Sequence, residues 1–244
     1  MKKLELVNVS VRVHESFSLS NISASFSEGE LVVLTGQSGS GKTVLLKTIC
    51  GIFGYTGTIA KNNINSVAFQ FQEGGLFDTL TVADNLAFQK FKGKKFLKEL
   101  PEAEKQVEFL RIWDIASFLN ISEAIFKKPY ELSGGMKKRA VLGRALMEKV
   151  DLLILDDPTA GLDPINSRIA KEKILAIISK FSPITLLATH ALRVFLPLAS
   201  KILFLQNGRL VFQGTYSEFL KADLIPESFK LIAALKKKKK KLNQ

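Results

Sequence analysis

The sequence contains a single cysteine, Cys50, which excludes an intramolecular disulfide. No apolar run reaches the roughly 18–20 residues that a membrane-spanning helix needs, so no transmembrane segment is predicted. Met1-Lys2-Lys3 leads into alternating apolar and polar residues and not into the apolar block of a signal peptide. These absences favour a cytoplasmic protein, in which Cys50 is interpreted as a small buried thiol without a redox role.

Acidic residues are scarcer than basic ones, since 23 Asp and Glu stand against 35 Lys and Arg, for a formal net charge of +12. Half of this excess comes from one run of six lysines, Lys236–Lys241. We interpret the run as a solvated tail that could attract an anionic membrane surface, or RNA without sequence specificity. No specific nucleic-acid partner is predicted. The hydrophobic content of 46% excludes a disordered chain.

A glycine-rich segment, Gly36–Thr43, lies between an apolar strand at 31–35 and an apolar helix that begins at Lys42. In a phosphate-binding P-loop, glycines allow a tight turn with N–H groups pointing inward, lysine neutralises the outer phosphates and Thr43 ligates Mg²⁺. The alternative is a loop that only turns the chain, but the strand-loop-helix context favours the P-loop. The predicted nucleotide-binding residues are Gly36, Gln37, Ser38, Gly39, Ser40, Gly41, Lys42, Thr43 and Val44.

Strands and helices alternate over much of the remaining sequence. Expected strands are 4–13, 31–35, 58–61, 66–71, 152–155, 184–189, 201–206 and 209–213, with a hairpin at Asn207-Gly208. Expected helices are 42–52, 82–91, 102–113, 136–148, 165–180 and 191–198. The pattern predicts an α/β fold: a mostly parallel sheet with flanking helices, an N-terminal antiparallel β subdomain and an inserted helical lobe.

Two further segments carry chemistry. The apolar strand 152–155 is followed by Asp156, a carboxylate placed to reach Mg²⁺ beside the P-loop. Ser133 is a potential N-cap before Gly134 and Gly135, whose exposed N–H groups would make a second anion-binding helix end. An ordinary glycine-rich cap is the alternative for this second segment.

In residues and order, Leu132-Ser133-Gly134-Gly135-Met136 resembles the signature sequence of ATP-binding cassette (ABC) ATPases, and the resemblance extends over roughly 2–220. It implies a P-loop NTPase with ATP and Mg²⁺ as cofactors. It also implies one domain over 1–222, with a core at 1–75 and 150–222 and a helical lobe at about 76–149. Residues 223–244 would form a C-terminal extension with the basic tail.

Further site residues follow from the resemblance alone. Gln72 matches the glutamine that contacts Mg²⁺ and the attacking water. Gln70 is the alternative, but the similarity of the sequence at 71–77 to the family favours Gln72. His190 matches the switch histidine near the γ-phosphate, and Ala160–Asp163 matches the loop that couples paired subunits. Lys42, Gln72, Asp157 and His190 are the predicted catalytic residues, and Thr43, Gln72 and Asp156 the predicted metal ligands.

The sequence departs from the family pattern at two places. Asp157 stands where the family usually has glutamate, so its carboxylate is one methylene shorter and slower hydrolysis is expected. The adenine-stacking aromatic is also missing, because Val13 occupies the expected position. His14 and Phe17 remain alternatives for stacking on the base.

The resemblance also implies partners: a second ATPase subunit, whose nucleotide Ser133 and Gly135 would cover, and an integral permease docking by 72–86 at the inner face of the inner membrane. Met136, Lys137–Ala140 and Glu73–Asp78 are most similar to the ATPase of Mce-associated (Mla-type) phospholipid transporters. A transporter for another substrate, a soluble ABC ATPase acting on ribosomes or nucleic acid, and a nucleotide-gated scaffold are the alternatives.

Overall fold

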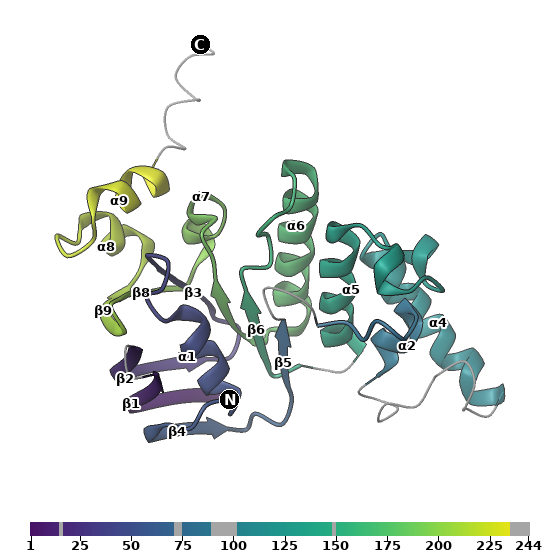
Figure 1. Cartoon of the computed structure of the whole chain (residues 1–244), viewed down its shortest axis with the longest axis horizontal. Helices are drawn as coiled ribbons and strands as arrows, with labels where there is room; N and C mark the ends of the chain where they lie inside the picture. The colour runs from purple at the N-terminus through teal and green to yellow at the C-terminus, as the bar shows by residue number, and fades with distance from the viewer. Residues whose placement is uncertain (15–16, 71–74, 89–101, 148–149, 235–244) are drawn as a thin grey trace, which may run out of the picture. The chain divides into compact units, whose positions relative to one another are not determined.

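The computed structural model describes residues 1–14, 17–70, 75–88, 102–147 and 150–234 (Figure 1). The chain divides into two compact units. The first comprises Met1–Val67, Asp151–Asp157 and Ser182–Gln244, and the second comprises Ala68–Val150 and Pro158–Phe181. The predicted α/β class is confirmed, including the antiparallel β subdomain and the mostly parallel sheet.

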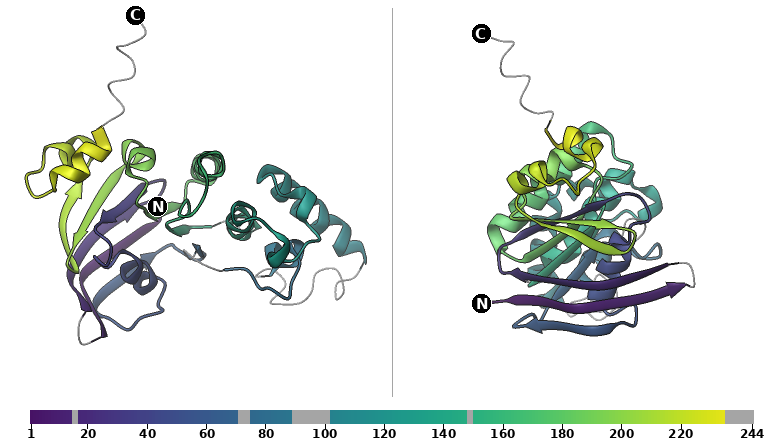
Figure 2. Two further views of the ribbon diagram at one scale, coloured as in Figure 1. Left: turned by 45° about the horizontal axis from the view of Figure 1, so that its top comes forward. Right: turned by 90° about the vertical axis from the view of Figure 1, so that its left-hand side faces the viewer.

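A three-stranded antiparallel sheet opens the first unit, with β1 (Lys3–His14) between β2 (Phe17–Ser27) and β4 (Thr56–Asn62) (Figure 2, right). The apolar face of β1 uses even positions up to Leu6 and odd positions from Val9 onward, and these side chains are buried. A register shift between them, at Asn8 with φ 52°, inserts the extra residue that keeps both halves facing one core.

The larger sheet places its strands in the order β6-β7-β3-β8-β9 within the first unit. Its strands are β3 (Leu31–Gly36), β6 (Leu152–Asp156), β7 (Ile184–Ala188), β8 (Lys201–Gln206) and β9 (Arg209–Gly214). All neighbouring pairs are parallel except β8 and β9, which form the predicted hairpin. Every residue of β3, β6 and β7 is buried, as expected for central parallel strands covered on both faces. The carboxyl ends of these three strands meet at one edge.

Helices complete the first unit. Helix α1 (Lys42–Ile49) follows β3 and packs against β3, β6 and β7. Helices α8 (Tyr216–Lys221) and α9 (Glu227–Ala234) follow β9, and the ring of Phe204 on β8 contacts Phe219 and Phe229 from them. The helix expected over 191–198 is shorter than predicted, because α7 (Leu192–Phe195) gives way to a 3₁₀ turn, Leu196–Leu198. Pro197 lacks the N–H that would continue the α-helix.

The second unit is helical apart from most of the short strand β5 (Val67–Gln70). It contains α2 (Val82–Ala87), α4 (Glu102–Phe118), α5 (Gly134–Met147), α6 (Pro164–Phe181) and the 3₁₀ turns Ser122–Ala124 and Pro129–Glu131. Helix α5 packs against α2, α4 and α6, with Leu86, Ile112 and Leu142 in the core. Among the described helices of both units, none is long and apolar enough to cross a membrane.

Asp151 should stabilise the first unit measurably, because its carboxylate accepts hydrogen bonds from the Asn65 and Ser66 amides at 2.8 and 3.1 Å and lies 3.2 Å from the Lys2 ammonium. We expect Asp151→Ala to lower the free energy of unfolding by about 1–3 kcal/mol in urea titrations, since two amides lose their acceptor. Glu28→Ala, which removes the other partner of Lys2, should cost less stability than Asp151→Ala, because water screens this exposed ion pair.

The advantage conferred by Asp151 should also depend on pH. Burial raises the pKa of this carboxyl, but hydrogen bonds from Asn65, Lys2 and Ser66 outweigh burial and lower it overall. The contribution is therefore complete above the unfolded-state pKa of about 4 and disappears as pH falls through the lower native value. Equal stability of the parent and Asp151→Ala at pH 7 would contradict this role.

Candidate functional site

The segment Gly36–Thr43 joins the end of β3 to the start of α1 at the carboxyl edge of the sheet. Gly36 has φ 144°, and a Cβ atom there would lie 2.1 Å from the Leu205 carbonyl oxygen of β8. Only glycine can therefore start this loop. Gln37, Ser38 and Gly39 are exposed, whereas Ser40 is buried. The loop presents an exposed crest above a buried base.

Lys42 lies at this base, where its Nζ donates to the carbonyl oxygens of Gly36 at 3.0 Å and Gln37 at 2.9 Å. Burial lowers the pKa of Lys42, while the charges of Asp157 and Asp156 oppose the shift. The Ser40 Oγ is buried without a hydrogen-bond partner among the described residues. A buried cation and an unpaired hydroxyl in a loop that opens a helix fit a phosphate group.

Asp156 ends β6 with its carboxylate buried, and the Thr43 hydroxyl hydrogen-bonds to it. Burial raises the pKa of Asp156 and the charge of Asp157 adds to the effect, whereas Thr43, Lys47 and Lys42 oppose it. The two residues predicted to ligate Mg²⁺ are therefore brought together. Among the described residues no group of three or more His, Cys, Asp or Glu could hold a metal ion. Mg²⁺ here would take its remaining ligands from phosphate and water.

Asp157 adopts a left-handed backbone conformation with φ 46°, and its N–H donates to the Ala188 carbonyl at 2.8 Å. Its Oδ1 accepts a hydrogen bond of 3.3 Å from the Thr189 hydroxyl, which in turn accepts the Ala191 N–H at 2.9 Å. Thr189 was not predicted as a site residue. Its signal in the sequence is a hydroxyl at the end of an apolar strand, directly before His190.

For the other predicted site residues, the structure gives a position but does not test the proposed contact, or does not describe the residue. His190 is exposed just beyond β7, and its proposed phosphate contact stays a prediction. Gln72 lies outside the described residues; its alternative, Gln70, is buried with Oε1 lacking a hydrogen-bond partner in the described part of the chain. Val13 is half-buried on β1, and the residue that stacks on adenine also stays a prediction.

The predicted signature segment belongs to the second unit. The Ser133 Oγ accepts the Met136 N–H at 3.2 Å, which confirms the expected N-cap of α5. Ser133 and Gly134 are exposed. A Cβ atom on Gly135 would lie 2.7 Å from the Oδ1 of Asn166 on α6, so glycine allows α5 and α6 to approach closely at this end.

The loop Ala160–Asp163 is joined to the signature helix in the same unit. Lys138 of α5 donates to the Ala160 carbonyl oxygen, and Arg139 donates to the Asn166 Oδ1 at 2.7 Å. Asn166 in turn donates to the Asp163 carboxylate at 2.5 Å. This side-chain hydrogen bond, followed by one from the Asn166 N–H, lowers the pKa of Asp163. The signature and this loop therefore form one hydrogen-bonded structure.

The first unit thus has the features of a P-loop nucleotide-binding protein: a lysine at the base of a glycine-rich loop, with a threonine and two adjacent carboxylates beside it. Comparison with known proteins specifies the class. The family model for the ABC transporter matches residues 19–160, and the chain belongs to this family as an ATP-binding subunit.

Curated relatives carry different names. The chain is 31% identical over 238 residues to the energy-coupling factor transporter ATP-binding protein EcfA2 of Thermotoga maritima, covering 89% of this chain and 85% of the relative. It is 32% identical to the thiamine import ATP-binding protein ThiQ of Aliivibrio fischeri, covering 86% and 90%. It is 30% identical to the chloroplastic protein TRIGALACTOSYLDIACYLGLYCEROL 3 of Arabidopsis thaliana, covering 85% and 68%.

Solved structures agree with this membership. The ADP conformation of MJ1267, an ATP-binding cassette of an ABC transporter, superposes with a TM-score of 0.76 at 25% identity, covering 95% of this chain and 99% of that chain. A dimeric post-hydrolysis state of the cassette MJ0796, bound to ADP and Pi, has the same fold with a TM-score of 0.73 at 23% identity, covering 87% and 98%.

Lys42→Ala should weaken ATP binding at least about tenfold, because the phosphates lose a charge-assisted hydrogen bond from the base of the loop. Fluorescence titration with a labelled ATP analogue measures this change. Lys221→Ala, which removes an exposed lysine from α8 in the same unit, should leave the affinity unchanged. Unchanged ATP affinity in Lys42→Ala would contradict the assignment of the site.

Proposed function

We propose that the chain hydrolyses ATP as one of two cassettes that drive an integral permease, and that the transported substrate is phospholipid. The observation that carries the proposal is the convergence of Lys42, Asp156 and Asp157 at one edge of the sheet. The ATPase part rests on this geometry and on family membership. The substrate rests on similarity in sequence alone.

Nucleotide binding is assigned to the P-loop. Lys42 is already held at the base of the loop by two backbone carbonyls, so its ammonium needs little reorientation to meet a phosphate. The unpaired Ser40 hydroxyl supplies a further polar group. Thr43 and Asp156 would hold Mg²⁺, which when bound neutralises negative charge on the phosphates and the buried carboxylate.

Asp157 is proposed to orient the attacking water and accept its proton. The hydrogen bond from Thr189 and the backbone bond to Ala188 fix the direction of its carboxylate. Aspartate reaches one methylene less far than glutamate from the same backbone position. We therefore expect hydrolysis that is active but slower than a glutamate at this position would support.

A second cassette is proposed because the ABC ATPase resemblance implies that the signature of one subunit covers the nucleotide of another. In this proposal the Ser133–Gly135 end of one subunit, where Ser133 and Gly134 are exposed, covers the nucleotide held by Gly36–Thr43 of another. Its exposed N–H groups and the positive end of α5 are suited to the γ-phosphate. The dimeric MJ0796 structure is consistent with such a pair.

The permease is proposed to dock on the segment that leads into α2. Asn85 binds this segment from α2: its Nδ2 donates to the carbonyls of Phe77, Leu80 and Thr81 at 3.0–3.2 Å, and its Oδ1 accepts the Phe77 N–H at 2.8 Å.

Arg144 of α5 donates to the Gly75 carbonyl, and its guanidinium lies 5.3 Å from the Phe77 ring centroid. Phe77 is 41% exposed and stacks on Phe88 with centroids 4.0 Å apart. A partner that moves this segment would therefore also act on the signature helix.

Phospholipid is the proposed substrate because Glu73–Asp78 and Met136 match the wording of Mla-type ATPases. A relative named after a galactolipid, TRIGALACTOSYLDIACYLGLYCEROL 3, also supports a lipid substrate. In this proposal the permease holds the chain at the inner face of the membrane. Lys236–Lys241, which lies outside the described residues, would add contact with anionic lipid.

Substitutions at Asp157 test the catalytic assignment. Asp157→Asn should lower kcat by about 10²–10⁴-fold with little change in KM, because the amide cannot accept the proton. The kcat of Asp157→Glu should equal or exceed that of the parent. Phosphate release from the complex with the permease is the measurement, since an isolated cassette lacks its partner. An Asn variant as active as the parent would remove Asp157 as the catalyst.

The substrate is tested by purifying the tagged chain with its permease and placing the complex in vesicles with fluorescent phospholipid. We expect lipid movement that requires ATP and is lost in Lys42→Ala. Parallel vesicles receive radiolabelled thiamine or sulfate. ATP-driven uptake of either solute, with no movement of phospholipid, would overturn the lipid substrate and leave the ATPase assignment standing.

A further inference from the structure

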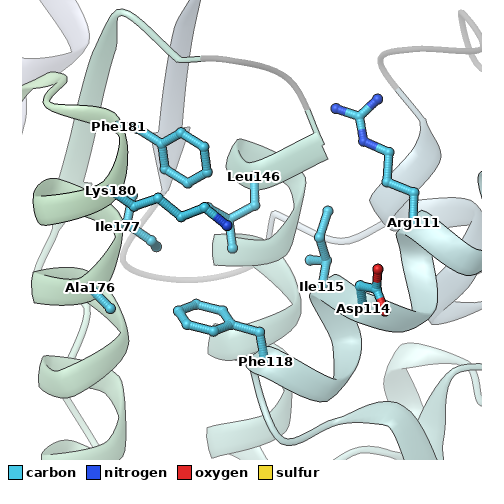
Figure 3. A pocket seen from close by; sticks show the side chains of 9 residues that line it. All are labelled: Arg111, Asp114, Ile115, Phe118, Leu146, Ala176, Ile177, Lys180 and Phe181. Carbon is cyan, nitrogen blue, oxygen red and sulfur yellow. The ribbon is translucent and has the colours of Figure 1, made fainter.

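The second unit contains a cavity of about 330 Å³ where the C-terminal ends of α4, α5 and α6 meet (Figure 3). It lies at the far end of α5 from Ser133, about 20 Å along the helix axis. Its apolar lining consists of Ile115, Phe118, Leu146, Ala176, Ile177 and Phe181. The cavity therefore belongs neither to the P-loop site nor to the signature segment.

This lining is incompletely covered. Phe118 at the end of α4 is 38% exposed, whereas Ile177 on α6 is only 3% exposed. The cavity thus has a buried apolar floor and an aromatic side chain at its mouth. Its volume is at the lower end of the range for small-molecule sites, about 300–1,000 Å³. A single hydrocarbon chain fits this volume better than a two-chain lipid.

Charged groups at the mouth are mostly cationic. Figure 3 shows the Lys180 side chain extended across the cavity between the rings of Phe118 and Phe181, with Arg111 and Asp114 on the α4 wall. The Lys173 ammonium lies 4.5 Å from the centroid of the Phe118 ring.

Asp114 is the one acid in this lining. In the described part of the chain, Lys180 makes no ion pair. Lys180 is exposed, and its ammonium lies 5.3 Å from the centroid of the Phe181 ring. An anion at the mouth would form an ion pair with this ammonium, whereas an uncharged ligand would not.

We propose that this cavity binds a single-chain anionic amphiphile, with its carboxylate at Lys180 and its alkyl chain against Phe118 and Ile177. The apolar floor selects the chain, the cationic mouth selects the charge, and the volume suits one chain better than two. This ligand is distinct from the nucleotide and from the substrate of the permease. The site exists in the chain alone, so its occupancy can be measured without ATP or a permease.

The test uses the full chain and decanoate below its micellar concentration, with binding followed by calorimetry. We expect saturable binding of one decanoate per chain and at least about tenfold weaker binding of decanol, which lacks the charge. Lys180→Ala should weaken decanoate binding to a similar degree without affecting decanol. Lys180→Arg should retain it. Trp113, the single tryptophan, lies on α4 next to Asp114 and provides a second readout by fluorescence.

Two further variants separate the site from general adsorption. Ala176→Phe fills the cavity and should abolish binding of both ligands, whereas Lys127→Ala removes an exposed lysine of the same unit outside the cavity and should change neither. Circular dichroism checks that each variant is folded. Equal affinity for decanoate and decanol, or full decanoate binding in Ala176→Phe, would overturn the proposal. Self-association lost in Phe118→Ala, without decanoate binding, would identify a second copy as the occupant and also overturn it.

Discussion

The site depends on one constraint: two charged side chains are buried away from water at the carboxyl edge of the larger sheet. Lys42 and Asp156 are buried, and burial lowers the pKa of Lys42 and raises the pKa of Asp156. Such groups are costly unless they are paired or hydrogen-bonded. The chain compensates partly, with two carbonyls for Lys42 and the Thr43 hydroxyl for Asp156. A bound polyanion would neutralise the charge of Lys42, and a bound divalent cation would neutralise that of Asp156.

The second unit depends on a different kind of interaction. Its signature end and the following loop are joined by hydrogen bonds among Arg139, Asn166 and Asp163. The segment before α2 is joined to the same helix by Arg144. Helix α5 therefore connects the surface proposed for the permease to the surface proposed for the nucleotide of a partner. This helix, with side-chain contacts at both ends, is the route by which the two proposed binding events would be coupled.

Much of this arrangement could be predicted from the sequence, because its signals are local. The P-loop, Asp156 and the Ser133 cap each consist of consecutive residues whose chemistry depends on short backbone geometry. Strand β2 is absent from the predicted strands. Its apolar residues alternate with serine on both sides of Ser20-Asn21, but this pair breaks the period of two, and Asn21 has φ 52°. The domain boundaries and the role of His190 stay predictions.

Interactions between distant residues were harder to foresee. Thr189 meets Asp157 across 32 positions of sequence, and Asn166 meets Arg139 across 27. The local sequence around Thr189 or Asn166 does not indicate the partner residue, because both contacts arise from tertiary packing. Similarly, the cavity at Phe118 forms only where three helix ends meet. Amphipathic spacing predicts that such helices are buried on one face but not how completely their ends close.

Cys50, the single cysteine, is half-buried just after α1, and burial raises the pKa of its thiol to about 11. At neutral pH only on the order of one thiol in ten thousand is then ionised and ready to react. A cysteine introduced at an exposed position would outcompete it for maleimide reagents by a wide margin. The natural chain is therefore already suited to attaching one spectroscopic label to each unit, so that their separation can be followed through a cycle of ATP turnover.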